Sequence, residues 1–360
     1  MKEQIRVLAA SSADDLRVGV DLAKAAVVKF NAATMIPETE KVNFALPKNQ
    51  RLIGIDAAVY RQIEAAVRAD KRHVMLYGPP GTGKTELARY LAARLTSKTY
   101  VLVTGSADWS SQDLIGGYQP LGDGKIGFVP GILLRNFDRP FIIDEMNRCD
   151  IDKVLGPLFT VLSKGSTTLP YRVNVVDPLS AQYQILGSYQ PEAPAHVYSP
   201  APDWRIIATI NTVDKSSLYQ MSYALSRRFA WIFVDAPTDL DGFIRNYITS
   251  VKKTMTAEPQ PCVIATIWAA VNSVRRMGAA PFIDMIAHCL AVDDQFDFGH
   301  APNARTAVTY LDAFRVHVMP MLDGALRDEL EPLALLINSV LGADGSDADA
   351  LKLQMSTLGL

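Results

Sequence analysis

Short apolar runs alternate with amphipathic stretches through residues 50–237 of this sequence. Runs of strand length occur at residues 73–77, 100–103, 140–143, 205–210 and 230–234. Stretches with helical spacing lie between and beside them, among them residues 56–68 and 86–95. Strands that alternate with helices predict an α/β fold, in which a parallel sheet is covered by helices on both faces.

The pattern changes after Pro237, where no further run is typical of a strand. Helical spacing recurs instead, for example over residues 263–277 and 306–318. The tail after Gly342 opens with turn residues, and we expect its end to be mobile. One amphipathic helix is expected near the N-terminus, over residues 13–30. The predicted organisation is an N-terminal helical segment (1–49), an α/β core (50–237) and an all-helical domain with its tail (238–360).

The composition of the sequence argues against several classes of protein and of binding site. The 360 residues carry 36 Lys and Arg against 38 Asp and Glu, and this balance argues against a generally basic nucleic-acid binder. The three cysteines are far apart and the five histidines lack metal-ligand spacing, so we expect neither a disulfide framework nor a zinc site. The N-terminus lacks the pattern of a signal peptide, and no stretch approaches the roughly 18 apolar residues of a membrane helix. We therefore expect a soluble, cytoplasmic protein.

A glycine-rich motif follows the first predicted strand and precedes a predicted helix. Residues 78–85, Gly-Pro-Pro-Gly-Thr-Gly-Lys-Thr, match the phosphate-loop (Walker A) pattern G-x-x-x-x-G-K-[ST]. Such a loop points successive N–H groups at the phosphates of ATP or GTP, and the following helix adds its positive dipole end. Lys84 is expected to reach the β- and γ-phosphates, and the Thr85 hydroxyl to hold Mg²⁺. The predicted nucleotide-binding residues are Gly78, Pro79, Pro80, Gly81, Thr82, Gly83, Lys84, Thr85 and Glu86.

A second apolar strand, at residues 140–143, is followed by Asp144 and Glu145. A P-loop enzyme needs a carboxylate at the end of a neighbouring strand to orient Mg²⁺, and Asp144 fits this role. Glu145 is then placed to polarise the attacking water as general base. The alternative is a strand that ends in a solvated acidic turn, which agrees less well with the alternating pattern around it.

The phosphate loop together with residues 144–148, Asp-Glu-Met-Asn-Arg, resembles the AAA+ superfamily of ATPases. Residues 142–148 and the later 211–216, Asn-Thr-Val-Asp-Lys-Ser, are similar to its McrB-like and MoxR-like (dynein-related) branch. The resemblance covers residues 50–235 and implies a P-loop core followed by a helical lid. It also implies ATP, with GTP as the alternative nucleotide, and Mg²⁺ as cofactors.

Further residues take their roles from this resemblance. Asn211 matches the sensor position, where an amide can hydrogen-bond the attacking water or the γ-phosphate. Arg227 and Arg228 match the arginine fingers that the family supplies to the neighbouring subunit's nucleotide, and which of the two is the finger stays open. Arg305 matches a second sensor arginine more weakly, because two residues separate it from the preceding proline. Fingers that act in trans imply a homo-oligomeric ring, most often a hexamer.

Two insertions mark the same branch. Residues 113–131 resemble the hairpin inserted in the second helix of this clade, with residues 122–124, Gly-Asp-Gly, as its turn. Such hairpins line the central pore of the ring. Residues 169–203 are a long Pro- and Tyr-rich stretch, and a loop of this length inside a compact domain is normally functional. We expect its tyrosines either to contact a partner or to pack the insertion together; they include Tyr183, Tyr189 and Tyr198.

The predicted function is an AAA+ ATPase motor whose ring couples hydrolysis to remodelling or activation of a partner protein, as in MoxR-like proteins. A McrB-like DNA translocase of a restriction or defence system is the alternative, with GTP in place of ATP. The partner would be a von Willebrand A domain protein in the first case, and a nuclease subunit together with DNA in the second. A nucleotide-gated scaffold is a third interpretation, against which the intact Lys84, Asp144, Glu145 and Arg227 argue.

Overall fold

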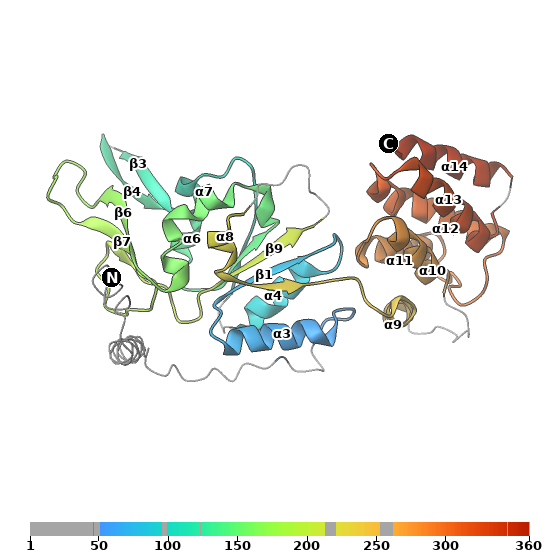
Figure 1. The fold of residues 1–360 in the computed structure, drawn as a ribbon, viewed down its shortest axis with the longest axis horizontal. Coiled ribbons are helices and arrows are strands. Elements are labelled where there is room, and N and C mark those ends of the chain that lie inside the picture. Colours follow the sequence, from blue (N-terminus) through green and yellow to red (C-terminus); the bar gives the residue numbers. More distant parts are fainter. Residues whose placement is uncertain are drawn as a thin grey trace, which may run out of the picture. The chain divides into compact units, whose positions relative to one another are not determined.

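The computed structural model describes residues 46, 51–95, 99–122, 124–212, 221–252, 262–343 and 345–359 (Figure 1). The chain divides into two units, Met1–Phe44 and Ala45–Leu360, and every described residue belongs to the second. The helix predicted over residues 13–30 and almost all of the segment 1–49 lie outside the described residues. Within the described part, no helix has both the length and the apolar character needed to cross a membrane.

A parallel sheet of five strands forms the centre of the α/β part, in the spatial order β10-β1-β9-β5-β2. The strands are β1 (His73–Gly78), β2 (Val101–Thr104), β5 (Phe141–Asp144), β9 (Ile206–Asn211) and β10 (Phe229–Phe233). Each predicted strand is confirmed, with its ends shifted by one residue at most. Because the strands are parallel, the carboxyl ends of β1, β5 and β9 meet at one edge of the sheet.

Helices cover both faces of this sheet (Figure 1). Met75, Ile143 and Ala208 belong to one buried cluster with residues of α6 and α7, and their neighbours in each strand face the other side. The helices packed in this cluster are α5 (Ser111–Leu114), α6 (Ile132–Arg135), α7 (Ile151–Leu155) and α8 (Tyr223–Ser226). The predicted helices are confirmed as α3 (Ala57–Arg68), which contacts β10, and α4 (Lys84–Leu95), which contacts β1. Asp56 caps α3 by accepting a hydrogen bond from the N–H of Ala58 at 2.6 Å.

The described residues after 238 form helices and no strand, as predicted. These helices are α9 (Leu240–Lys252), α10 (Val263–Val274), α11 (Ala280–Val292), α12 (Ala304–His317), α13 (Arg327–Leu341) and α14 (Ser346–Leu358). Their buried faces form a cluster of their own that includes Trp268, Phe282 and Phe314. This cluster and that of the α/β part lie on either side of the boundary predicted at residues 237 and 238, which itself stays a prediction.

The expectation of a mobile tail is wrong for the described residues. The chain after Gly342 forms α14, which packs on α13. Gly342 and Gly345 have φ of 63° and 59°, so the turn residues noted in the sequence end one helix and lead into the next. Leu351 and Met355 lie four residues apart on one face of α14, and both are buried. Burial of this apolar face holds the tail in place.

Both predicted insertions contain strands. β3 (Gly116–Gly122) pairs antiparallel with β4 (Lys125–Pro130), and residue 123 of the predicted turn lies outside the described residues. The stretch 169–203 is not one long loop, because it contains most of a small three-stranded sheet. The strands of this sheet are β6 (Thr167–Arg172), β7 (Gln182–Ile185) and β8 (Val197–Tyr198).

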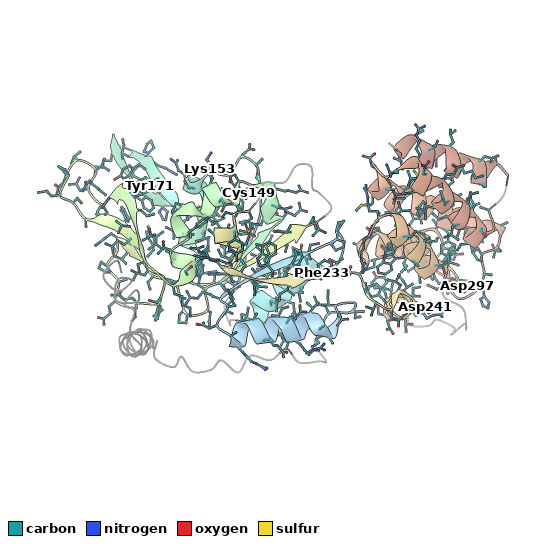
Figure 2. The ribbon with its side chains drawn as sticks, viewed as in Figure 1. Cys149, Lys153, Tyr171, Phe233, Asp241 and Asp297 are labelled. Carbon is teal, nitrogen blue, oxygen red and sulfur yellow. The ribbon has the colours of Figure 1, made fainter. Side chains whose placement is uncertain are left out.

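Aromatic packing joins the two insertions. Phe128 of β4 lies against Tyr171, Tyr183 and Tyr198, with ring centroids 5.1, 4.5 and 6.1 Å away (Figure 2 labels Tyr171). Two of the three tyrosines noted in the sequence therefore pack the insertion, whereas Tyr189 is 54% exposed. This burial of aromatic surface accounts for the ordered sheet where the sequence predicts a loop.

Candidate functional site

The phosphate loop joins the end of β1 to the start of α4. A Cβ at Gly78 would lie 2.1 Å from the carbonyl oxygen of Val234, so only glycine allows this close approach. Gly83 has φ of 82°, a left-handed conformation that leads the chain into the first turn of α4. A glycine-rich loop that opens a helix in this way is a favourable place for phosphate groups.

Lys84, in the first turn of α4, is only 5% exposed. Its ammonium group donates hydrogen bonds to the carbonyl oxygens of Gly78 and Pro79, at 3.1 and 2.6 Å. Because a buried ammonium group needs polar partners, these carbonyls hold the side chain within the loop. Lys84 is thus positioned where the sequence predicts a phosphate contact.

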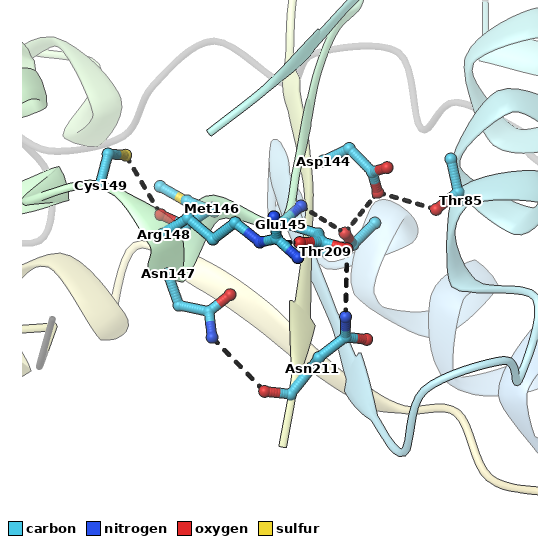
Figure 3. Close-up of polar contacts among 9 residues, drawn as sticks. All are labelled: Thr85, Asp144, Glu145, Met146, Asn147, Arg148, Cys149, Thr209 and Asn211. Atoms are coloured by element: carbon cyan, nitrogen blue, oxygen red, sulfur yellow. Dashed lines mark hydrogen bonds and ion pairs between the residues drawn. The ribbon is translucent and has the colours of Figure 1, made fainter. Parts of the chain in front are cut away.

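Asp144 lies at the end of β5, where one of its oxygens meets two hydroxyl groups (Figure 3). Asp144 Oδ1 accepts hydrogen bonds from Thr85 Oγ1 at 2.8 Å and from Thr209 Oγ1 at 2.6 Å. Neighbouring oxygen ligands of octahedral Mg²⁺ lie about 3 Å apart, since each is about 2.1 Å from the ion. The oxygens of Thr85 and Asp144 therefore fit a shared Mg²⁺ site, and these are the two residues predicted to hold the ion.

Glu145 follows Asp144 in a left-handed conformation, with φ of 49° and ψ of 50°. Its N–H donates to Thr209 Oγ1 at 2.9 Å, and its Oε1 accepts from the amide of Asn211 at 3.3 Å. Its second oxygen, Oε2, forms an ion pair with Nε of Arg148 (Figure 3). Non-glycine residues in this conformation are uncommon and cluster at functional sites. The predicted base and the predicted sensor, 66 positions apart in the chain, are in direct contact.

Two members of this network, Thr209 and Arg148, are missing from the sequence prediction of the site. Thr209 is 2% exposed and lies in an otherwise apolar strand, and this contrast is the signal that the sequence offers. Arg148 stands three residues after Glu145, a spacing that brings side chains together on a helical turn.

A cavity of about 720 Å³ opens beside the network. Part of its lining is polar and comes from residues 81–86 with Asp144, Glu145 and Asn211. The rest is largely apolar and comes from residues 51–55 and the helices α9 and α11, including Ile53, Ile55, Phe243, Tyr247 and Ile283. A cavity of this size, with apolar walls and a few grouped polar side chains, is typical of cofactor sites. The arrangement suits a nucleotide, with the base against apolar residues and the phosphates at the loop.

The helical part contacts the phosphate loop directly. The N–H of Gly278 donates to the carbonyl oxygen of Pro80 at 2.9 Å, and the N–H of Ala280 donates to that of Gly81 at 3.2 Å. A Cβ on Gly278 would lie 2.1 Å from the backbone of Gly81, so the two segments touch through their main chains. Any movement of α9 or α11 relative to the loop would therefore change the cavity.

Comparison with known proteins identifies the family of the α/β part. Residues 73–229 match the family described as "AAA domain (dynein-related subfamily)". Residues 73–229 are therefore similar to an AAA domain. This finding agrees with the parallel sheet and the phosphate loop, and it confirms the resemblance noted in the sequence. The family match and the phosphate loop together indicate a nucleotide site in this part of the chain.

Curated relatives share this AAA domain. The type IV methyl-directed restriction enzyme EcoKMcrB subunit of Escherichia coli (strain K12) is 31% identical over 201 residues, which are 52% of this chain and 40% of that protein. The Holliday junction branch migration complex subunit RuvB of Ligilactobacillus salivarius (strain UCC118) is 30% identical over 152 residues, 38% of this chain and 44% of that protein. The matched part thus spans less than half the length of these relatives. Among solved structures, the Thermotoga maritima RuvB Holliday junction branch migration motor is 17% identical, covers 83% of this chain and 84% of its own, and has a TM-score of 0.43.

The two adjacent arginines of the AAA domain differ in their surroundings, and neither lines the cavity. Arg228 Nε donates to the carbonyl oxygen of Phe159 at 2.6 Å, and its guanidinium carbon lies 5.2 Å from the ring centroid of Phe159. Arg227 is exposed, and its side chain makes no hydrogen bond or ion pair with any residue that the structure describes. The structure therefore leaves Arg227 available to a neighbouring molecule.

Arg305 is apart from the other predicted site residues. Its side chain is 81% exposed, its Nη2 lies 3.6 Å from Asp293 Oδ2, and it does not line the cavity. Asn303 caps α12 by accepting hydrogen bonds from the N–H groups of Arg305 and Thr306, both at 3.0 Å. The nucleotide contact proposed for Arg305 stays a prediction.

Proposed function

We propose that this chain is an AAA+ ATPase that works as a homo-oligomeric ring, a hexamer by family resemblance, and couples ATP hydrolysis to remodelling or activation of a protein partner. The observation that carries the proposal is the hydrogen-bonded network of Thr85, Asp144, Glu145 and Asn211 beside one cavity. These side chains come from α4, from the end of β5 with the residue that follows it, and from β9, so three parts of the chain converge on one place suited to the end of a triphosphate.

Each residue has one task in this proposal. Lys84 and the N–H groups of the phosphate loop bind the phosphates, and Thr85 and Asp144 would hold Mg²⁺. When bound, the ion neutralises charge on the β- and γ-phosphate oxygens. Glu145 accepts the proton of the attacking water, and Asn211 orients that water through its amide. The helical part, which lines the same cavity, excludes bulk water.

The ring is supported by the exposed guanidinium of Arg227. It does not line the cavity of its own chain, yet a P-loop ATPase gains a large part of its rate from an arginine at the γ-phosphate. An arginine supplied by the next subunit meets this need, and subunits that each complete a neighbour's site close most simply into a ring.

The first experiment measures phosphate release from ATP, and in parallel from GTP, by the purified chain with Mg²⁺. Turnover of ATP is expected, and Glu145→Gln should lower it by about 100-fold or more while leaving the binding of a fluorescent ATP analogue intact. Native mass spectrometry with a non-hydrolysable ATP analogue then reports assembly. A chain that binds the analogue but stays monomeric, or that releases no phosphate from either nucleotide, contradicts the proposal.

One observation favours a second function, that of a subunit of a DNA-translocating motor. The chain is similar over 201 residues to a subunit of a restriction enzyme. In that case duplex DNA should stimulate hydrolysis, GTP should be preferred, and a nuclease subunit should co-purify. Stimulation by a von Willebrand A domain protein and not by DNA would favour the first function.

A further inference from the structure

Protein groups engage both carboxylate oxygens of Glu145. Oε1 accepts a hydrogen bond from the amide of Asn211 at 3.3 Å. Oε2 is buried from solvent, accepts no hydrogen bond from the described residues and has Nε of Arg148 as its ion-pair partner. A general base must offer an oxygen within hydrogen-bond reach of the water that it deprotonates. In the present arrangement Oε2 cannot meet this condition.

The partner that engages Oε2 lies outside the nucleotide cavity. Glu145 and Asn211 line the cavity, but Arg148 does not. The ion pair therefore directs one oxygen of the predicted base away from the place of the attacking water. Figure 3 shows the Arg148 side chain extended alongside Glu145.

The pair is local and can open without disturbing the core. Arg148 is the last residue of the single 3₁₀ turn Met146–Arg148, three positions after Glu145. The Arg148 side chain is 55% exposed, and that of Glu145 is 25% exposed. An arginine with so much accessible surface can exchange its partner for a carboxylate or phosphate brought by another molecule.

We infer that Arg148 is a latch on the general base: while the pair is closed Glu145 is withheld from the attacking water, and hydrolysis requires the pair to open. The inference rests on the proposed function and adds to it a positioning residue that restrains turnover in the absence of a partner. Arg148 does not line the nucleotide cavity and acts through Glu145.

The test compares steady-state ATP hydrolysis by the wild type, Arg148→Ala, Arg148→Lys and Arg148→Gln, each as the full chain. Arg148→Ala and Arg148→Gln should raise kcat by about threefold to fivefold, the upper part of the range for loss of a partly exposed ion pair, with KM unchanged. Arg148→Lys keeps a charge that can reach Glu145 and should stay near the wild-type rate. The matched control is Arg68→Ala, which opens the ion pair between the half-exposed Arg68 and Glu64 and should change neither constant.

The latch is overturned if kcat for Arg148→Ala and Arg148→Gln is equal to or lower than that of the wild type. The ion pair between Arg148 and Glu145 would then assist the general base or have no effect on it. Turnover by the wild type alone decides whether the chain is an ATPase. Failure of the latch can therefore be distinguished from failure of the proposed function. Inactivity of the wild type and of every variant contradicts both the latch and the proposed function.

A second measurement does not depend on turnover. Modification of Arg148 by a guanidine-specific dicarbonyl reagent, followed by mass spectrometry, should be faster in Glu145→Gln than in the wild type, with Arg68 as the internal reference. Equal rates at Arg148 in the two proteins would show that the pair is not formed in solution, and would overturn the inference.

Discussion

At the scale of single residues, the adjacent Arg227 and Arg228 are alike in the sequence but not in the structure. Arg228 binds the backbone of Phe159 and lies over its ring, whereas Arg227 is exposed. We expect Arg227→Ala to lower kcat by about 10³-fold, the lower range for an arginine finger, with stability and nucleotide affinity unchanged. Arg228→Ala should instead lower the free energy of unfolding by about 1–2 kcal/mol, because it removes contacts within the fold.

Urea unfolding and binding of a fluorescent nucleotide separate these two effects. If Arg228→Ala proves inactive but fully stable, Arg228 is the finger and the assignment is reversed.

His73, the first residue of β1, links stability to pH. It is 1% exposed, and its Nδ1 accepts a hydrogen bond from the N–H of Ile206 at 3.0 Å. Burial, reinforced by the charges of Arg72 and Arg205, holds the pKa of His73 well below its ordinary value of 6.5. The unfolded chain therefore binds a proton that the folded chain does not, so this contribution to stability is complete above pH 6.5 and is lost as the pH falls below it.

Between pH 7.5 and 5.5, protonation of His73 in the unfolded chain should reduce the free energy of unfolding, by roughly 1 kcal/mol. His73→Asn keeps an acceptor near the position of Nδ1 but cannot titrate, and it should show a smaller loss over the same interval. Urea unfolding of both proteins at the two pH values measures the difference. Identical pH dependence in the two proteins would contradict the role of His73.

Some site residues could be predicted because their place in the chain fixes their place in the sheet. Asp144 and Asn211 each end a strand, and carboxyl ends of parallel strands gather at one edge. Thr209 lies two residues before the end of β9, and its role depends on the pairing of β5 with β9, which the sequence does not display. The spacing of three residues is the signal for the pairing of Arg148 with Glu145, but it brings the side chains together only on a helical turn, and the sequence does not display the turn that follows the left-handed Glu145.

At the scale of elements, α7 and α8 connect the acidic end of β5 to the arginine pair. Asp152 of α7 accepts hydrogen bonds from the N–H and the hydroxyl of Ser222, at 2.6 and 2.5 Å. Ser222 is the N-cap of α8, and Arg227 is its C-cap. The four-residue helix α8 is thus held at one end by Asp152 and presents Arg227 at the other.

Loss of the hydrogen bonds between Asp152 and Ser222 should misplace Arg227, but it should leave the nucleotide cavity of the same chain unchanged. We expect Asp152→Ala to lower kcat by about tenfold or more, because small errors in the position of a reacting group are costly, while nucleotide affinity stays unchanged. The matched control is Asp150→Ala, which removes only the cap of α7 through the N–H of Lys153. Hydrolysis assays of both variants check this, and equal rates in the two would remove the proposed link between α7 and Arg227.

The insertion at residues 169–203 shows why some elements escape sequence prediction. β7 has four residues and β8 has two, too few for an alternation of apolar and polar positions to be recognised. These two strands are held in place by aromatic contacts with Phe128 of the other insertion, which lies more than forty positions earlier in the chain. The five strands of the main sheet are predictable because each coincides with an apolar run in the sequence, and the three central strands β1, β5 and β9 are largely buried.

At the scale of the whole molecule, the proposed site is complete only where two subunits meet. A Lys84→Ala subunit lacks the phosphate contact but still offers Arg227, and an Arg227→Ala subunit binds nucleotide but offers no finger. Each variant alone should be nearly inactive. In a ring assembled from equal amounts of both, about a quarter of the interfaces combine an intact nucleotide site with an intact finger, and activity should return at those interfaces.

Subunit mixing therefore tests the ring and the direction of sharing together. The control mixes Lys84→Ala with Glu145→Gln, where every site lacks either the phosphate contact or the general base, so no interface can recover. Recovery in the first mixture alone establishes that Arg227 acts on a neighbour's nucleotide. Failure of both mixtures, although native mass spectrometry finds mixed rings, would place the arginine's action within one chain, and the exposed position of Arg227 would then need another explanation.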